Sequence, residues 1–78
     1  MRAFDQIQRL LRLHDLIRRQ ATGNAISLAN RLNISRPTVY RYLDDLKDFG
    51  ADIYYCRDRQ SYCYNGNFIL EFSGRLIE

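Results

Sequence analysis

The chain has 78 residues, enough for one compact domain with a modest core, and 46% of them are hydrophobic, too many for a disordered segment. Twelve basic and nine acidic residues give a net charge of +3, and the pI is about 9.1, which weakly favours a polyanionic partner. No apolar run approaches the roughly 20 residues of a membrane span. The N-terminal stretch MRAFDQIQRLLRL is interrupted by charges, unlike a signal peptide, so we expect a cytoplasmic protein without membrane contact.

The first predicted element is a helix over residues about 4–20. Charged residues recur in it at spacings of three and four and share one side. The opposite side is an apolar stripe with the only histidine in its middle: Ile7, Leu10, Leu11, His14, Ile17 and Ala21. Leu13 and Leu16 fall partly outside the stripe, so we expect them to be exposed or to meet a partner. His14 is expected to be a core residue with a satisfied ring nitrogen, because no nucleophile or second histidine accompanies it.

A short second helix is predicted over residues about 25–32. The preceding ATGN breaks the first helix, since Gly23 suits a left-handed turn and Asn24 can cap a new helix. The turn NIS follows, in which Asn33 tolerates the left-handed conformation. Ile34 is apolar within this turn, so we expect it to fill the core between two helices.

The third helix is predicted over residues about 36–49, with Ser35 as its N-cap and Gly50 as its C-cap. Its core face is Val39, Tyr42, Leu43 and Leu46. The front half of its outer side lacks the Glu, Lys and Gln of an ordinary solvated face. It carries Arg36, Pro37, Thr38, Tyr40 and Arg41 instead, whereas Asp44, Asp45 and Asp48 are confined to the back half. Free amides at a helix N-terminus attract phosphate, so this front half is a candidate nucleic-acid surface.

A β-hairpin is predicted over residues about 52–65, where DIYYC and SYCYN flank RDRQ. With Asp58 and Arg59 as a two-residue turn, Tyr55 pairs with Tyr62 and Ile53 with Tyr64, which places these four side chains on one face. Arg57 and Arg59 then lie at the exposed tip. Cys56 and Cys63 share the other face diagonally, which disfavours a disulfide, and their spacing does not suit zinc. We therefore expect two reduced thiols and no metal site.

The order of helix, short helix, tight turn, helix and basic-tipped hairpin resembles the small bacterial winged helix-turn-helix domains of the biotin-operon-repressor and DeoR-like type. The resemblance extends over residues about 10–65 and rests mainly on SLANRLNISRPTVYRYLDDLKDFG. It implies an α+β fold, with one domain over residues 1–78. We also expect a C-terminal strand at about 68–72, in FILEF, which pairs either within the chain or with a second chain.

The resemblance assigns DNA contacts to residues around the start of the third helix and at the wing tip: Ser35, Arg36, Pro37, Thr38, Tyr40, Arg41, Arg57 and Arg59. It implies that Ser35 and Thr38 contact phosphate and that Arg41 contacts backbone or base. The third helix would lie in the major groove, and the wing tip would reach flanking phosphates or the minor groove.

The expected function is therefore that of a sequence-specific DNA-binding protein, a small prokaryotic transcriptional regulator whose partner is double-stranded DNA. A homodimer is expected, because a modest charge gives one chain few phosphate contacts. The alternative is a winged-helix module that docks on a protein, since the acids of the third helix could repel phosphate. An enzyme is not expected, because paired carboxylates, a Ser-His-Asp set and a phosphate loop are all missing from the sequence. No catalytic residue, cofactor or small-molecule ligand is implied.

Overall fold

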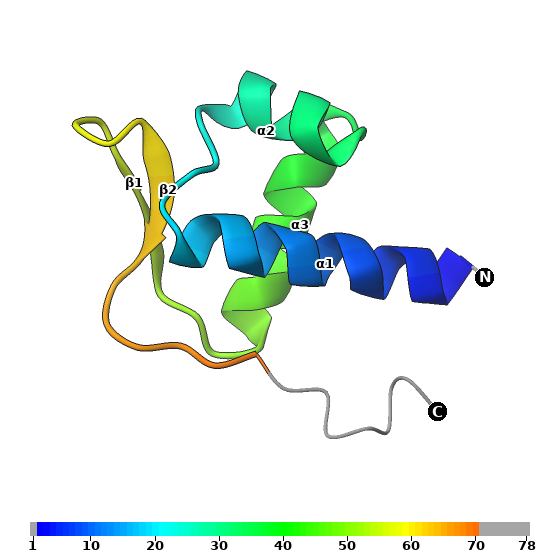
Figure 1. Cartoon of the computed structure of the whole chain (residues 1–78). Coiled ribbons are helices and arrows are strands. Elements are labelled where there is room, and N and C mark those ends of the chain that lie inside the picture. The colour runs from blue at the N-terminus through cyan, green and yellow to red at the C-terminus, as the bar shows by residue number, and fades with distance from the viewer. Residues whose placement is uncertain (1, 71–78) are drawn as a thin grey trace.

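The computed structural model describes residues 2–70 of the chain. Helices α1 (Arg2–Arg18), α2 (Ala25–Leu32) and α3 (Arg36–Asp48) are followed by the antiparallel strands β1 (Ile53–Cys56) and β2 (Ser61–Tyr64). The hairpin lies at one end of the helical body, and the N-terminal turns of α1 project from the other end (Figure 1). This is the predicted winged helix-turn-helix architecture.

Each helix ends in the same hydrogen-bonded pattern, in which one residue turns left-handed and the next amide returns to a carbonyl five positions back. The left-handed residues are Gln20, Asn33 and Gly50, with φ values of 59°, 58° and 107°. The returning bonds run from Ala21 to Leu16 at 2.9 Å, from Ile34 to Ala29 at 3.0 Å and from Ala51 to Leu46 at 3.1 Å. Asn33 and Gly50 were expected in this role, whereas Gln20 ends α1 before Gly23 can. The helix consequently stops at Arg18 and not at about residue 20.

The core is formed by residues from the three helices and the start of the following loop: Leu10, Leu13, Ile17, Leu28, Ala29, Leu32, Val39, Tyr42, Leu43, Leu46 and Ala51. The predicted core face of α3 is confirmed, and Ile34 packs against the core as expected. The predicted face of α1 is wrong in part, because Leu13 is 0% exposed and Leu16 packs against the core, whereas Leu11 is 38% exposed. Helix α1 contacts α2, α3 and β2, so its buried side is set by three neighbours and is turned away from the predicted stripe.

The predicted register of the hairpin is confirmed, since Ile53 pairs with Tyr64 and Tyr55 with Tyr62. The predicted turn centred on Asp58 and Arg59 is also present. The amide of Gln60 donates to the carbonyl of Arg57 at 3.2 Å, and Gln60 takes the left-handed conformation with a φ of 50°.

Both faces of β2 are covered, which the alternating pattern does not indicate. Tyr62 and Tyr64 pack against the core on one face, as expected, but Ser61 and Cys63 on the other face are also fully buried. Ser61 lies against the connection between α1 and α2, where Thr22 is fully buried and is hydrogen-bonded to β2. The connection therefore runs beside β2 in the place that a third strand would take.

Thr22 and Ser61 form a satisfied network of buried hydroxyl groups. The amide of Thr22 donates to Ser61 Oγ at 3.1 Å, and the amide of Tyr62 donates to Thr22 Oγ1 at 2.9 Å. The two hydroxyls donate onward to the carbonyls of Gly23 and Tyr62, at 2.8 and 2.9 Å. The base of the wing is therefore held to the helical body by hydrogen bonds that are buried or partly buried.

Replacing Thr22 by Val, which has nearly the same shape, should lower the free energy of unfolding by about 2 kcal/mol. The amide of Tyr62 would lose its acceptor in a buried site. Thr22→Ser keeps the hydroxyl and loses only a methyl group, so it should cost about 1 kcal/mol. Urea denaturation of the two variants measures the difference, and a valine variant no less stable than the serine variant would contradict the role given to this hydroxyl.

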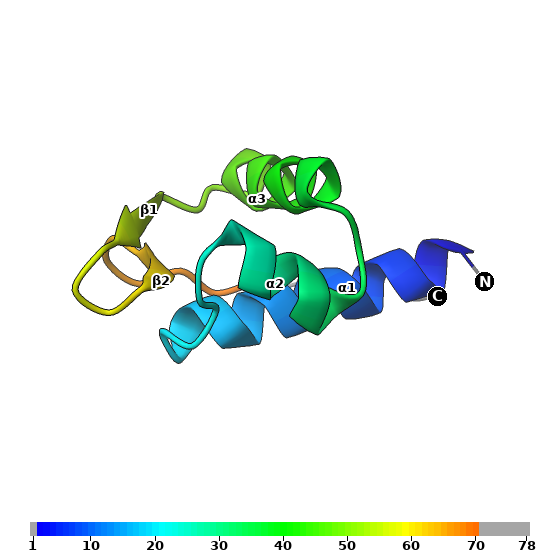
Figure 2. The same ribbon diagram turned by 90° about the horizontal axis from the view of Figure 1, so that it is seen from above.

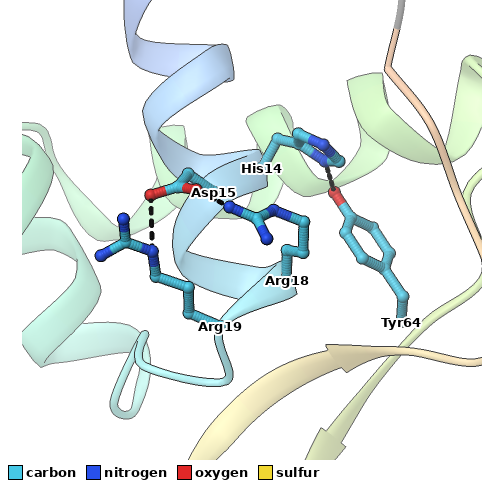
Figure 3. Close-up of polar contacts among 5 residues, drawn as sticks. All are labelled: His14, Asp15, Arg18, Arg19 and Tyr64. Carbon is cyan, nitrogen blue, oxygen red and sulfur yellow. Dashed lines mark hydrogen bonds and ion pairs between the residues drawn. The ribbon is translucent and has the colours of Figure 1, made fainter.

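His14 connects α1 to the wing, as Figure 3 shows. Its Nδ1 atom and the Tyr64 hydroxyl are hydrogen-bonded at 2.8 Å, which confirms the prediction of a satisfied histidine. The ring of Phe68 lies against both, with centroids 5.8 Å from His14 and 5.1 Å from Tyr64. Burial and the nearby Arg18 lower the pKa of His14, while burial raises the pKa of Tyr64 well above its usual value. Both groups are thus held in their neutral forms at neutral pH.

The predicted C-terminal strand at about 68–72 is wrong for the residues described. The amide of Asn65 donates to the carbonyl of Asp52 at 2.8 Å, after which Gly66 turns the chain with a φ of 88°. Residues 67–70 are irregular, and residues 71 and 72 lie outside the described part. Phe68 and Leu70 pack against the core, while Ile69 is 76% exposed. Core packing of Phe68 on His14, not strand pairing, therefore positions this segment.

Candidate nucleic-acid interface

Helix α3 forms one face of the molecule, with the hairpin at its flank and α1 on the opposite face (Figure 2). Pro37 and Arg41 are exposed and lie opposite the buried side that Val39 and Leu46 form. Arg36 is also exposed and lies on the side of α3 that faces the hairpin, where it lines a hollow with Tyr55. The front half of α3 therefore presents arginine side chains both outward and toward the wing.

The start of α3 carries two hydroxyl groups from the predicted set. Ser35 Oγ accepts a hydrogen bond from the amide of Thr38 at 3.3 Å and is 2.8 Å from Thr38 Oγ1. Both α2 and α3 lack acidic residues in their first turns. The partial positive charge of both helix N-termini is thus not neutralised locally, which suits an anion such as phosphate.

The arginines of this surface are not neutralised by carboxylates. Among residues 2–70, the ion pairs join Asp15 to Arg18 and Arg19, at the end of α1 (Figure 3). The hydrogen bond from Arg18 lowers the pKa of the Asp15 carboxyl, so this pair stays charged down to acidic pH. The arginines near α3 and at the wing tip have no such partner in the described part, and their charge is available to an outside anion.

The hairpin tip carries Arg57 and Arg59, both exposed in the turn between β1 and β2. The tip lies at one end of the molecule, whereas the N-terminal end of α3 lies nearer its middle (Figure 2). The two groups of predicted DNA contacts are therefore spaced apart along the molecule.

Tyr40 lies beside the wing although it is half exposed. Its side chain is 50% exposed and lines a hollow together with Tyr62 on β2. The pKa of the Tyr62 hydroxyl is raised, mainly by burial and to a lesser extent by the nearby Tyr40. The ring of Tyr55 stands edge-on to Tyr62 with centroids 5.0 Å apart. Tyr55 and Tyr62 were not among the residues predicted for this surface, although the predicted register places them opposite each other.

The remaining features concern chemistry other than DNA binding. Cys56 and Cys63 are free thiols, as predicted, and burial raises the pKa of Cys63. Within residues 2–70, no group of three potential metal-ligating side chains comes together. No helix in the same range has the length and apolar character needed to cross a membrane.

A family model described as an HTH domain matches residues 5–59 of the chain. The matched region includes most of α1, the whole of α2 and α3, and the hairpin as far as its tip. No curated protein and no solved structure matches the chain. A match of this kind supports a DNA-binding regulator in general and points away from an enzyme. Because the model covers more than half of the sequence, the chain belongs to the HTH domain family.

Proposed function

We propose that the chain is a sequence-specific regulator of transcription, similar to the small bacterial domains of the biotin-operon-repressor and DeoR-like type. In this proposal α3 enters the major groove and the wing tip contacts the flanking backbone. The observation that carries it is the set of unneutralised arginines at the acid-free N-terminal end of α3, in a chain of the HTH domain family.

Each part of the surface has a distinct role in the proposal. Ser35 and Thr38 contact phosphate beside the helix N-terminus and so set the depth of α3 in the groove. Arg41, one turn further along the outer side, reaches a base edge or the backbone. Pro37 lies on the same side and offers an apolar contact to a base. Asp44 and Asp48 follow on this side, so the contacts with DNA are confined to the front half of α3.

Arg41→Ala should weaken DNA binding by about 1–3 kcal/mol without lowering the melting temperature, because the side chain is exposed and lies away from the core. Arg12→Ala is the matched control, since Arg12 is also an exposed arginine but lies on α1. It removes the same charge from a different helix. Binding of both variants to a duplex, measured by fluorescence anisotropy, separates a contact from a change in net charge. Equal affinities for the two variants would remove Arg41 from the interface.

A homodimer is part of the proposal, because a net charge of +3 supports few phosphate contacts for one chain and a second copy doubles them. The alternative function is docking on a protein, which Asp44 and Asp48 on the outer side of α3 favour. The electrophoretic mobility of a DNA duplex mixed with the protein, at low and at moderate salt, distinguishes these functions. A DNA-binding protein retards the duplex strongly at low salt, whereas a docking module leaves it free.

A further inference from the structure

A hollow of about 280 Å³ lies between the start of α2, the start of α3 and the hairpin. Arg36 and Tyr40 line it from α3, Tyr55 and Tyr62 from the hairpin, and Ile26 from α2. It has no acidic residue in its lining. A second hollow further along α3 contains Asp44, which makes it less suitable for an anion.

The position of the first hollow matches the geometry of DNA. In B-form DNA, the major groove and the next minor groove are separated by a ridge formed by one sugar–phosphate strand. If α3 lies in the major groove and the hairpin tip lies beyond it, the surface between the two elements must face this ridge. The hollow lies in that place, between α3 and β1.

We infer that this hollow is a binding site for the sugar–phosphate ridge, with Tyr55 as the neutral donor and Arg36 as the cationic donor to phosphate. This inference rests on the proposed function. It adds a contact that neither the resemblance nor the family match assigns, because Tyr55 and Ile26 were not among the predicted DNA-binding residues.

The chemistry of the lining suits a sugar–phosphate strand more than a base edge. Tyr62 is partly buried and packs against the core, whereas Tyr55 is 38% exposed, so the Tyr55 side chain is the more accessible of the two. Ile26 is 55% exposed and offers an apolar surface to a deoxyribose. Helix α2 begins at the hollow and has no acid in its first turn, so its N-terminal amides add partial positive charge. Guanidinium, hydroxyl, helix terminus and apolar surface therefore meet in one place.

A tyrosine donor leaves a distinctive thermodynamic signature. Arginine neutralises a phosphate and releases counterions, so its loss lowers the slope of log K against log salt by about one. A neutral hydroxyl releases no counterion. Its loss should therefore lower affinity by the same factor at every salt concentration and leave the slope unchanged.

The test uses the full chain and a mixed-sequence duplex of two helical turns, titrated by fluorescence anisotropy at several salt concentrations. Tyr55→Phe keeps the ring against Tyr62 and should bind about tenfold more weakly at each salt concentration, with a parallel line. Arg36→Ala should bind more weakly and with a lower slope. Tyr54→Phe is the matched control, since the neighbouring side chain is half exposed, points to the other face of β1 and does not line this hollow. Its affinity should stay within about twofold of the original.

Three results would overturn the inference. Tyr55→Phe could bind as tightly as the unaltered chain, it could lose no more affinity than Tyr54→Phe, or its loss could come with a lower melting temperature, which would assign the hydroxyl to wing packing. If the unaltered chain binds no duplex even at low salt, the proposed function fails together with the inference. If the chain binds DNA and responds to Arg41→Ala but not to Tyr55→Phe, the inference alone fails.

Discussion

Leu13→Ala should lower the free energy of unfolding by about 3–4 kcal/mol, the largest stability effect expected of a single substitution in α1. Leu13 is fully buried where α1 meets the other elements, so truncation removes apolar contacts and leaves a cavity that rigid neighbours fill only in part. A small domain has a total stability of about 5–10 kcal/mol, so the variant should unfold at a much lower urea concentration.

Leu11→Ala is the matched control, because it makes the same chemical change two positions away on a side chain that is 38% exposed. It should cost less than about 1 kcal/mol. Urea denaturation followed by circular dichroism gives both values. If Leu11→Ala proves as costly as Leu13→Ala, Leu13 does not lie on the buried side of α1. The apolar stripe predicted from the sequence would then be the buried side.

The double variant Arg57→Ala, Arg59→Ala should weaken DNA binding by at least about tenfold at low salt and should have the largest effect on its salt dependence. Both arginines are exposed at the tip and should each neutralise a phosphate. The slope of log K against log salt should fall by up to about two, and the loss should be about equal for all sequences.

The wing can act in this way because it is rigidly attached. The amide of Tyr62 donates to Thr22 in the connection between α1 and α2, and the hydroxyl of Tyr64 is hydrogen-bonded to His14 on α1. A hairpin held on both faces keeps its tip at a fixed distance from α3, so little conformational entropy is lost when DNA binds.

The control for the double variant is Arg57→Lys, Arg59→Lys, which keeps both charges and should retain most of the salt slope. Salt titrations of the two double variants against the same duplex make the comparison. A double alanine variant with the full salt slope would show that the hairpin does not touch DNA, and the docking function would then be favoured.

The elements whose limits depend on local signals could be predicted from the sequence. Helix α2 begins after Asn24, whose side chain accepts from the amide of Ser27, and α3 begins after Ser35, which accepts from Thr38. These capping interactions join residues three positions apart, so the sequence displays them directly. The hairpin register was predictable for a similar reason, because the alternation of its side chains fixes the pairing.

The features that were missed depend on contacts between distant residues. Thr22 and Ser61 are far apart in the sequence, and neither residue alone indicates that the other will be its hydrogen-bond partner. The buried side of α1 depends on three neighbours, not on its own periodicity. Gln20 adopts a left-handed conformation that Gly or Asn usually takes, so a glutamine at this position does not indicate the end of α1.

The candidate interface shows the same division. Its α3 and wing-tip residues were assigned from resemblance, and the structure exposes Arg36, Arg41 and the tip as that assignment requires. The tyrosine-lined hollow was not foreseen, because it forms only when β1 is placed against the start of α3. A pattern read along one element does not show what two elements enclose.

Selection of bound DNA from a random duplex pool tests the central claim most directly. The proposed regulator should enrich a defined sequence, and a homodimer should enrich two inverted half-sites with centres about one helical turn apart. Recovery of a pool that remains random after repeated rounds at low salt would contradict sequence-specific recognition by α3.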